Sequence, residues 1–320
     1  MKSTLKLAVA CLLFTFICSA HVYAWSDPGH MAVAFIAYKN LDDTTRARVD
    51  ALIKLNPRYP LWVAKLPPGV TNPKIRNEML FMIAATWADQ IKSDGKHVAD
   101  GPEGGNKPPQ DGTAAKNIGY QDHAMHKYWH FVDLPFSTDG TATVDAETPN
   151  ALTQIAAFRA VLSSSTATDK LKSYDLVWLM HLVGDVHQPL HCTARFTHQS
   201  PDGDAGGNLV KVCDGSCGAL HAFWDGRLGS ESSPNPNIVI NRAKGLPMPD
   251  AAKSANLNAD DWIKESFALA QADVYKAPVG PGKGPFTINA TYRNNATTIA
   301  KQQIALAGVR LANILNQELK

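Results

Sequence analysis

The chain has little cysteine, almost no net charge and only one long hydrophobic run. Five of its 320 residues are cysteines, and its 31 basic and 29 acidic side chains nearly cancel. Balanced charge gives no argument for or against a nucleic-acid partner. No second apolar run indicates a membrane span, and no internal repeat or low-complexity linker divides the chain.

The single hydrophobic run lies at the start of the chain. Lys2 and Lys6 form a basic beginning, "LAVACLLFTFICSA" is apolar, and "VYA" ends in the small residue Ala24. This order is typical of a signal peptide, and the run is short for a bilayer span. We therefore expect residues 1–24 to be cleaved off and residues 25–320 to be exported, without a membrane anchor, to the periplasm or the extracellular space.

Three cysteines remain after the predicted cleavage: Cys192, Cys213 and Cys217. In an oxidising compartment they allow one disulfide and leave one thiol. The short loop "CDGSC" makes Cys213 with Cys217 the simplest pair, while a pair between Cys192 and either of the others stays open.

Apolar residues recur at helical spacing along most of the chain. Gly/Pro-rich loops separate these segments at 93–118 and 276–290, and "NLVKVC" at 208–213 is the one good strand candidate. We predict an all-α class: a single, mainly helical domain over 25–320, with long loops and a short β-hairpin. The predicted helical segments are 29–41, 42–55, 76–92, 150–164, 174–190, 220–229, 259–275 and 297–317.

The most informative stretch is "HLVGDVHQPLH" at 181–191. His181 and Asp185 are one helical turn apart and share a face, while Pro189 ends the helix and lets His191 turn back. His221 and Asp225 in "HAFWD" repeat the same spacing. Imidazole and carboxylate are common zinc ligands, so two such pairs indicate a metal site.

Two further polar residues lie in apolar surroundings. Asp89 lies in "ATWADQIK" and His130 in "YWHFVD", and burial of either is costly unless it is paired or metal-bound. A lone histidine or aspartate is more often an ion-pair or surface residue. We assign that ordinary role to the histidines outside the pattern, which are His97, His123, His126, His187 and His198.

The stretch "AWSDPGH" at 24–30 places Trp25 and His30 directly after the predicted cleavage site. A newly exposed α-amino group has a pKa of about 7.7–8.0, so it can lose its proton to a metal and chelate together with its own carbonyl oxygen. His30, one turn further on, would supply the next ligand.

In order and combination, "WSDPGH", "TWAD", "WHFVD", "HLVGDVHQPLH", "GGN" and "LHAFWD" resemble the type I, zinc-dependent, single-strand-specific nucleases of the S-one/P-one group. This group shares a superfamily with zinc-dependent phospholipase C. The resemblance implies three zinc ions. The first is bound by Asp89, His130, His181 and Asp185; the second by Trp25, His30 and the bridging Asp185; the third by His191, His221 and Asp225.

The resemblance also implies the reaction. A hydroxide shared by two zinc ions, held through Asp89 and Asp185, attacks phosphorus, and the third zinc neutralises the departing 3′ oxygen. Phe131 and Asp133 match residues that stack on a nucleobase and bind its edge. The expected substrates are single-stranded DNA and RNA and 3′-nucleotides, the products carry 5′-phosphates, and we expect a monomer.

Two residues are less specific candidates for substrate binding. Arg227, two residues after Asp225, either grips phosphate or forms an ion pair on the surface. Asn208 either lines the site or, with Gly206 and Gly207, forms a hairpin turn.

Two other functions compete with the nuclease. Phospholipase C shares the terminal tryptophan and the three-metal arrangement, but its first histidine lies further from the tryptophan and a glutamate replaces Asp225. A non-catalytic, zinc-stabilised secreted binding protein would have closed metal sites. His191, His221 and Asp225 supply only three ligands, which favours a catalytic zinc with an open position.

Overall fold

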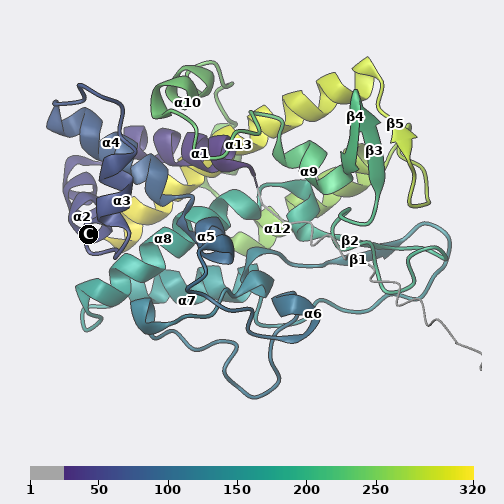
Figure 1. The fold of residues 1–320 in the computed structure, drawn as a ribbon, viewed down its shortest axis with the longest axis horizontal. Helices are drawn as coiled ribbons and strands as arrows, with labels where there is room; N and C mark the ends of the chain where they lie inside the picture. The colour runs from purple at the N-terminus through teal and green to yellow at the C-terminus, as the bar shows by residue number, and fades with distance from the viewer. Residues whose placement is uncertain (1–24) are drawn as a thin grey trace, which may run out of the picture.

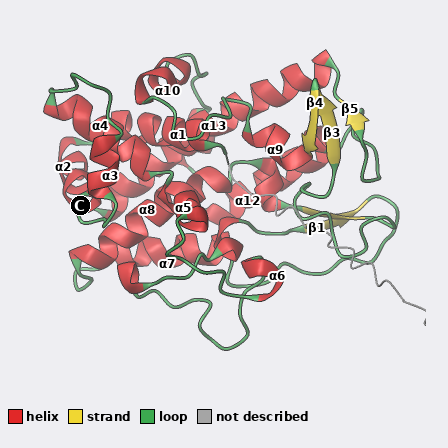
Figure 2. Cartoon of the chain, in the orientation of Figure 1, coloured by secondary structure: helices red, strands yellow, loops and turns green. Residues whose placement is uncertain are grey.

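The computed structural model describes residues 25–320, and the predicted signal peptide, 1–24, lies outside the described residues. Helices make up most of the described chain, with a few short strands gathered at one end (Figure 2). The predicted mainly helical class is therefore confirmed. Among the described helices, none is both long enough and apolar enough to cross a bilayer.

The helices and strands follow one another along the chain as shown in Figure 1. The helices are α1 (Asp27–Asn40), α2 (Asp43–Ile53), α3 (Tyr59–Ala64), α4 (Pro73–Ala84), α5 (Trp87–Gln90), α6 (Pro102–Gly105), α7 (Ala151–Ser163), α8 (Asp169–Asp185), α9 (Leu220–Asp225), α10 (Pro236–Ala243), α11 (Ala251–Ala255), α12 (Ala259–Leu269) and α13 (Ala290–Glu318). The strands are β1 (Pro135–Ser137), β2 (Ala194–Phe196), β3 (Lys211–Asp214), β4 (Ser216–Ala219) and β5 (Phe286–Thr287). Single helical turns lie at Ile91–Ser93, Gly119–Gln121, Lys127–His130 and Pro189–Cys192, and a π-helical turn at Ala270–Val274 follows α12.

Helix α8 runs through the main apolar core. The side chain of Thr168 caps its first turn by accepting a hydrogen bond from the Leu171 amide, and the helix ends before Pro189, as the proline predicts. All residues from 173 to 185 are buried. Helix α7 packs along α8, and α1 packs against both α13 and α4. His181 and Asp185 therefore project from a helix that is covered on every side.

A second, smaller apolar cluster lies where the strands meet α9 and α13. It contains Leu190, Val212, Trp224 and Tyr292. Strands β3 and β4 form the predicted hairpin, β5 adds a parallel strand to β3, and β1 pairs with β2 in parallel. The segment 189–192 joins the two clusters, because Leu190 belongs to this cluster and Cys192 to the main core.

The structure corrects several details of the sequence prediction. The segment 76–92 is not one helix, because the helix is interrupted at Ala85 and Thr86 between α4 and α5. Short helices α3, α10 and α11 and strands β1, β2 and β5 had too few periodic residues to be predicted. The simplest disulfide is confirmed: Cys213 is bonded to Cys217, and Cys192 is a buried free thiol.

Candidate metal centre

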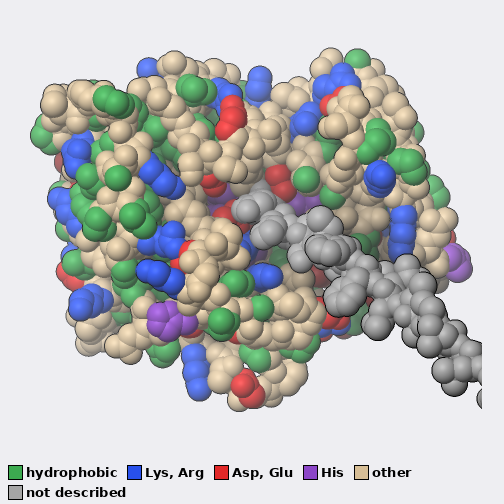
Figure 3. Space-filling model, in the orientation of Figure 1, with side chains coloured by type: hydrophobic (Ala, Val, Ile, Leu, Met, Phe, Trp, Pro, Cys, Tyr) green, Lys and Arg blue, Asp and Glu red, His purple; other side chains and the backbone are tan. Residues whose placement is uncertain are grey.

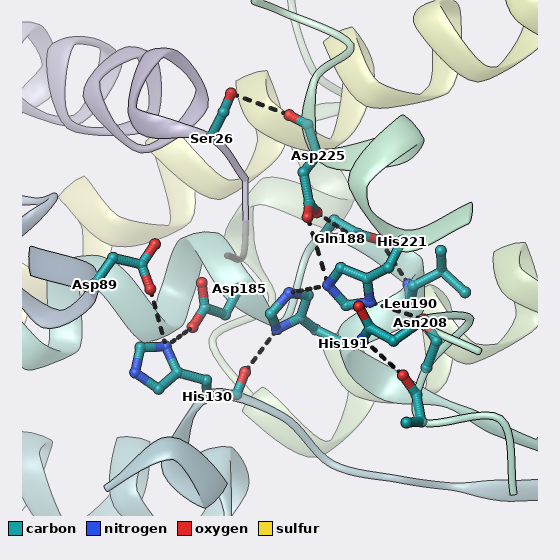
Figure 4. A network of polar contacts seen from close by, with 12 residues as sticks. Ser26, Asp89, His130, Asp185, Gln188, Leu190, His191, Asn208, His221 and Asp225 are labelled. Atoms are coloured by element: carbon teal, nitrogen blue, oxygen red, sulfur yellow. Dashed lines mark hydrogen bonds and ion pairs between the residues drawn. The ribbon is translucent and has the colours of Figure 1, made fainter. Parts of the chain in front are cut away.

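Three groups of buried side chains are arranged so that one ion could be bound by each. In every group the donor atoms lie within 4.8 Å of one another. Figure 4 shows Asp89, His130 and Asp185 on one side and His191, His221 and Asp225 on the other. The three triads are His30, His181 and Asp185; Asp89, His130 and His181; and His191, His221 and Asp225.

Asp185 lies at the middle of the first two triads. Its carboxylate oxygens are 2.9 Å from His130 Nδ1, 3.3 Å from His30 Nε2 and 3.5 Å from His181 Nε2. Asp89 Oδ1 lies 3.5 Å from His181 Nε2. The rings of His30 and His181 stack with their centroids 3.8 Å apart. Asp185 is thus placed where a single carboxylate can contact two neighbouring ions.

The third triad joins α9 to the turn after α8. The Nε2 atoms of His191 and His221 are 2.9 Å apart, and His221 Nε2 is 3.6 Å from Asp225 Oδ2. Gln188 Nε2 donates a hydrogen bond of 2.7 Å to Asp225 Oδ1, which orients the carboxylate. The main chain also connects the triads, because His191 Nδ1 donates to the carbonyl of His130 over 2.9 Å (Figure 4).

Backbone carbonyls hold three of the imidazole rings in one tautomer. His181 Nδ1 donates to the Ala85 carbonyl over 2.8 Å, and His221 Nδ1 donates to the Gly206 carbonyl over 2.7 Å, as His191 does to His130. Because a carbonyl only accepts, each Nδ1 carries the hydrogen and each neutral Nε2 keeps a lone pair for a metal. The break between α4 and α5 leaves the Ala85 carbonyl available for this contact.

The donor set fits buried cations. All of these histidines and aspartates are at most 5% exposed. His30 Nε2, Asp89 Oδ2, His130 Nε2, His181 Nε2 and Asp185 Oδ1 are buried without a hydrogen-bond partner, which is costly unless another ligand satisfies them. Burial raises the pKa of Asp185 to about 8 and raises that of Asp225 above its usual range. Nearby positive charge is therefore needed to keep both carboxylates ionised at neutral pH.

Two residues that sequence reasoning missed belong to this centre. Lys92 Nζ lies 2.7 Å from Asp89 Oδ1; burial alone would raise the pKa of Asp89, but Lys92 and His181 outweigh it and hold that pKa well below its usual value. Gly184 faces the ring of His30: a Cβ at this position would lie 2.8 Å from His30 Nδ1. The three-residue spacing of Asp89 and Lys92 could have indicated the first, but nothing local indicated the second.

Trp25 is completely buried beside the centre. Its side chain lies against Gly29, where a Cβ would come within 2.6 Å of the Trp25 Cβ. The next residue, Ser26, donates from both its amide and its hydroxyl to the Asp225 carbonyl, at 3.3 Å and 3.1 Å. The predicted role of the Trp25 amine depends on cleavage after residue 24, which lies outside the described residues.

The histidines that we assigned ordinary roles lie outside the three triads. His126 lies between Asp100 and Asp122, at 2.8 Å and 2.9 Å. His187, which lies within the key motif, donates from Nδ1 to the Val183 carbonyl and accepts at Nε2 from Arg310. His97 and His198 pair with Asp94 and Asp139, and His123 packs edge-on against the ring of His97.

A cavity of about 370 Å³ opens beside the third triad. Phe131, Asp133, Asn208 and His221 are among its lining residues. Burial raises the pKa of Asp133 to about 7, with the charge of Asp204 adding to the effect. Asn208 also closes a local turn by donating to the Ala205 carbonyl, so it forms a turn and lines the cavity at once.

Arg227 lies apart from that cavity. Its guanidinium stacks on the ring of Phe223 at 3.8 Å from the centroid, and its Nε donates to the Phe223 carbonyl. It is not among the residues that line the cavity. A phosphate contact by Arg227 stays a prediction.

Charged side chains gather on the face of the molecule shown in Figure 3. Figure 3 shows Asp, Glu and His atoms coming to the surface near the middle of this face, in the region between α5 and α9 of Figure 1. Lys and Arg side chains lie on the α5 side of this region. A negatively charged substrate that reaches the triads would therefore pass beside basic side chains.

Fold and site together define a mainly helical protein with three buried groups of donor side chains that could each hold a metal ion, the third of them beside a cavity. The chain belongs to the S1/P1 nuclease family, whose match covers residues 25–320. It is 25% identical to Nuclease S1 of Aspergillus oryzae over 314 residues, which cover 91% of this chain and 90% of that protein. It is 26% identical to Endonuclease 2 of Arabidopsis thaliana, covering 93% of this chain and 91% of that protein.

The family makes this protein a nuclease, a hydrolase that binds nucleic acid and acts on phosphodiester bonds. Its match favours this function over the alternatives of phospholipase C and a non-catalytic binding protein.

Proposed function

We propose that residues 25–320 form one exported, zinc-dependent endonuclease domain that cleaves single-stranded DNA and RNA to 5′-phosphorylated products. The same site would remove phosphate from 3′-nucleotides. The observation that carries this proposal is the arrangement of three buried donor triads, the third of which lies beside a cavity lined by Phe131.

The donors of the three triads, together with Trp25, would hold three zinc ions. Asp89, His130, His181 and Asp185 would bind the first, and the Trp25 amine and carbonyl, His30 and Asp185 the second. His191, His221 and Asp225 would bind the third and leave a position open for substrate. Zinc is favoured over magnesium or calcium because most of the donors are imidazole nitrogens.

When bound, the zinc ions would supply the positive charge that activates a water molecule and offsets the charge of the phosphate. Asp185 and Asp89 would hold that charge in place, and the hydrogen bond from Gln188 fixes the orientation of Asp225. In the overall reaction, the water oxygen bonds to phosphorus, the bond to the 3′ oxygen breaks, and that oxygen takes a proton.

Specificity for single strands would follow from how a base binds in the cavity beside the third triad, called the first cavity below. The ring of Phe131 offers a stacking surface, and Asp133 can bind the base edge. With its pKa raised to about 7, the Asp133 carboxyl can donate as an acid below that pH and accept as a carboxylate above it. A paired base in a duplex cannot present its face to Phe131.

The test compares single-stranded, double-stranded and 3′-mononucleotide substrates, with the protein zinc-loaded and after chelation. We expect cleavage of single strands to 5′-phosphates, loss of activity with a chelator, and recovery with zinc. Cleavage of phosphatidylcholine with oligonucleotides left intact would overturn the proposal.

A variant tests the metal assignment separately. Asp185→Asn should lose two zinc ions together, because this carboxylate contacts His30 and His130 in two different triads. Asp175→Asn is a matched control, since Asp175 is equally buried on the same helix but, within residues 25–320, its carboxylate hydrogen-bonds to Asn117 rather than to a candidate ligand. Retention of three zinc ions in Asp185→Asn would refute the bridging role.

A further inference from the structure

A second cavity, of about 280 Å³, is lined by residues that neighbour His30 and Asp89 in the chain, and it has no part in the function proposed so far. Its walls come from α1, the α3–α4 loop, the α4–α5 junction and the segment before α10. They include Asp27, Met31, Lys65, Leu66, Thr86 and Gln90. Its volume is near the lower end of the range for small-molecule sites, which suits a single nucleoside.

The two cavities meet different triads. The first is lined by His221 of the third triad and by Phe131, which follows His130. The second is lined by Met31, which follows His30, and by Thr86 and Gln90, which flank Asp89 in the chain. Asp27 in the second cavity is also close enough to interact electrostatically with Asp89 and His181, whereas the first cavity borders His221. The two cavities therefore lie near different parts of the centre.

The second cavity is held open by contacts among its own walls. The Ser233 amide donates a 2.6 Å hydrogen bond to Asp27 Oδ2, and Lys65 Nζ donates a 3.0 Å bond to Ser233 Oγ. Gln90 Nε2 donates to Thr86 Oγ1 over 2.6 Å. These bonds tie the start of α1 to the α3–α4 loop through the segment before α10, so the space exists before a ligand enters.

The lining suits a nucleoside joined to a phosphate. Met31, Leu66 and Ile83 offer apolar surface to a base or sugar, and Asp27 and Gln90 offer polar groups for its edges. Lys65 is exposed at the wall and is the one basic side chain among the lining residues, so it can meet a phosphate of an incoming strand.

Strand direction identifies the occupant. In the proposed function, on which this inference rests, the departing 3′ oxygen lies at the third triad and its nucleoside occupies the first cavity. The 5′ ester oxygen of the same phosphate, and the nucleoside attached to it, then lie on the side of the phosphate away from the third triad. We propose that the second cavity binds the nucleoside on the 3′ side of the scissile phosphate. After cleavage, this nucleoside carries the phosphate on its 5′ oxygen.

The test uses two substrates with the same leaving group. A dinucleotide has a nucleoside on each side of the phosphate, whereas a nucleoside 3′-methylphosphate has only the one in the first cavity. Since a bound base contributes strongly to single-strand affinity, wild type should cleave the dinucleotide with about tenfold higher kcat/KM.

Two variants should remove that preference. Lys65→Glu breaks the hydrogen bond of Lys65 to Ser233 in the cavity wall, and Leu66→Trp adds bulk to that wall. Both should lower kcat/KM for the dinucleotide toward that of the methyl ester and leave the methyl ester unchanged. Lys74→Glu, an equal charge change at an exposed residue of α4 outside the cavity, should keep the wild-type preference.

Equal loss on both substrates, or no loss on either in the correctly folded Leu66→Trp protein, would overturn the subsite and leave the proposed function intact. If zinc-loaded wild type cleaves neither diester, the proposed function fails and the subsite falls with it.

Discussion

Replacing Gly184 by alanine should separate metal binding from folding. Gly184 lies on α8 between the ligands His181 and Asp185, and a Cβ there would lie 2.8 Å from His30 Nδ1. Ordinary contact begins at 3.4 Å, so the ring of His30 must move by the difference, 0.6 Å. It cannot turn aside freely, because it is stacked on His181 at 3.8 Å.

That displacement exceeds what a metal site tolerates, since ligand distances vary by only about 0.2 Å. We expect Gly184→Ala to lose the zinc bound through His30 and to lower kcat/KM by about 100-fold, the usual effect of an error approaching 1 Å in an active site. The helix itself should not suffer, because alanine is favoured over glycine in a helix interior by about 1 kcal/mol.

Gly308→Ala is the matched control. Its Cβ would lie 2.6 Å from Ile36 Cβ, where α13 packs on α1 at a position six residues after His30. Overpacking there should cost about 1–3 kcal/mol and lower Tm without changing zinc content per folded molecule. Metal analysis after dialysis, circular dichroism and thermal melting separate the two cases. Full zinc content and activity in Gly184→Ala would refute the reasoning.

Three further predictions follow from the same structure. A protein that keeps residue 24 before Trp25 should bind less zinc than the cleaved protein and lose activity, while its circular dichroism spectrum stays unchanged; full activity of an uncleaved protein would contradict the amine ligand. Phe131→Ala should raise KM for single-stranded oligonucleotides by about 10-fold, the range expected for one lost stacking contact, with zinc content unaltered. Burial raises the pKa of Asp175 to about 7, and the hydrogen bond from Asn117 partly offsets this rise. The contribution of Asp175 to the free energy of unfolding is therefore full below the unfolded pKa of about 3.9 and is lost as pH rises through 7. Asp175→Asn should therefore raise Tm relative to wild type at pH 8 and leave it nearly unchanged at pH 4.

The helical class was predictable because amphipathic spacing is a local property. The segments 150–164 and 297–317 matched α7 and α13 because long apolar periodicity rarely has another explanation. The prediction of one helix over 76–92 was wrong at Ala85, where the helix is interrupted. There the Ala85 carbonyl accepts a hydrogen bond from His181 on α8. That partner is 96 residues away, so no local pattern could have indicated it.

The pairing of the candidate ligands along the chain was predictable for the same reason. His181 with Asp185, and His221 with Asp225, share a helical face at a spacing that the chain itself imposes. The spacing could not show that Asp185 also reaches His30 and His130 from other segments. Nor could it indicate Gln188 as the partner of Asp225, because that contact joins the turn after α8 to α9.

Sequence thus specified which donor atoms the chain carries, and where helical turns would pair them. Tertiary packing alone decided which pairs meet, because hydrogen-bond partners such as Ala85 and Gly206 come from distant segments and act through the backbone, whose carbonyls are the same in every residue. The two cavities beside the centre are likewise properties of packing, since each is the space left between segments that the sequence does not bring together locally.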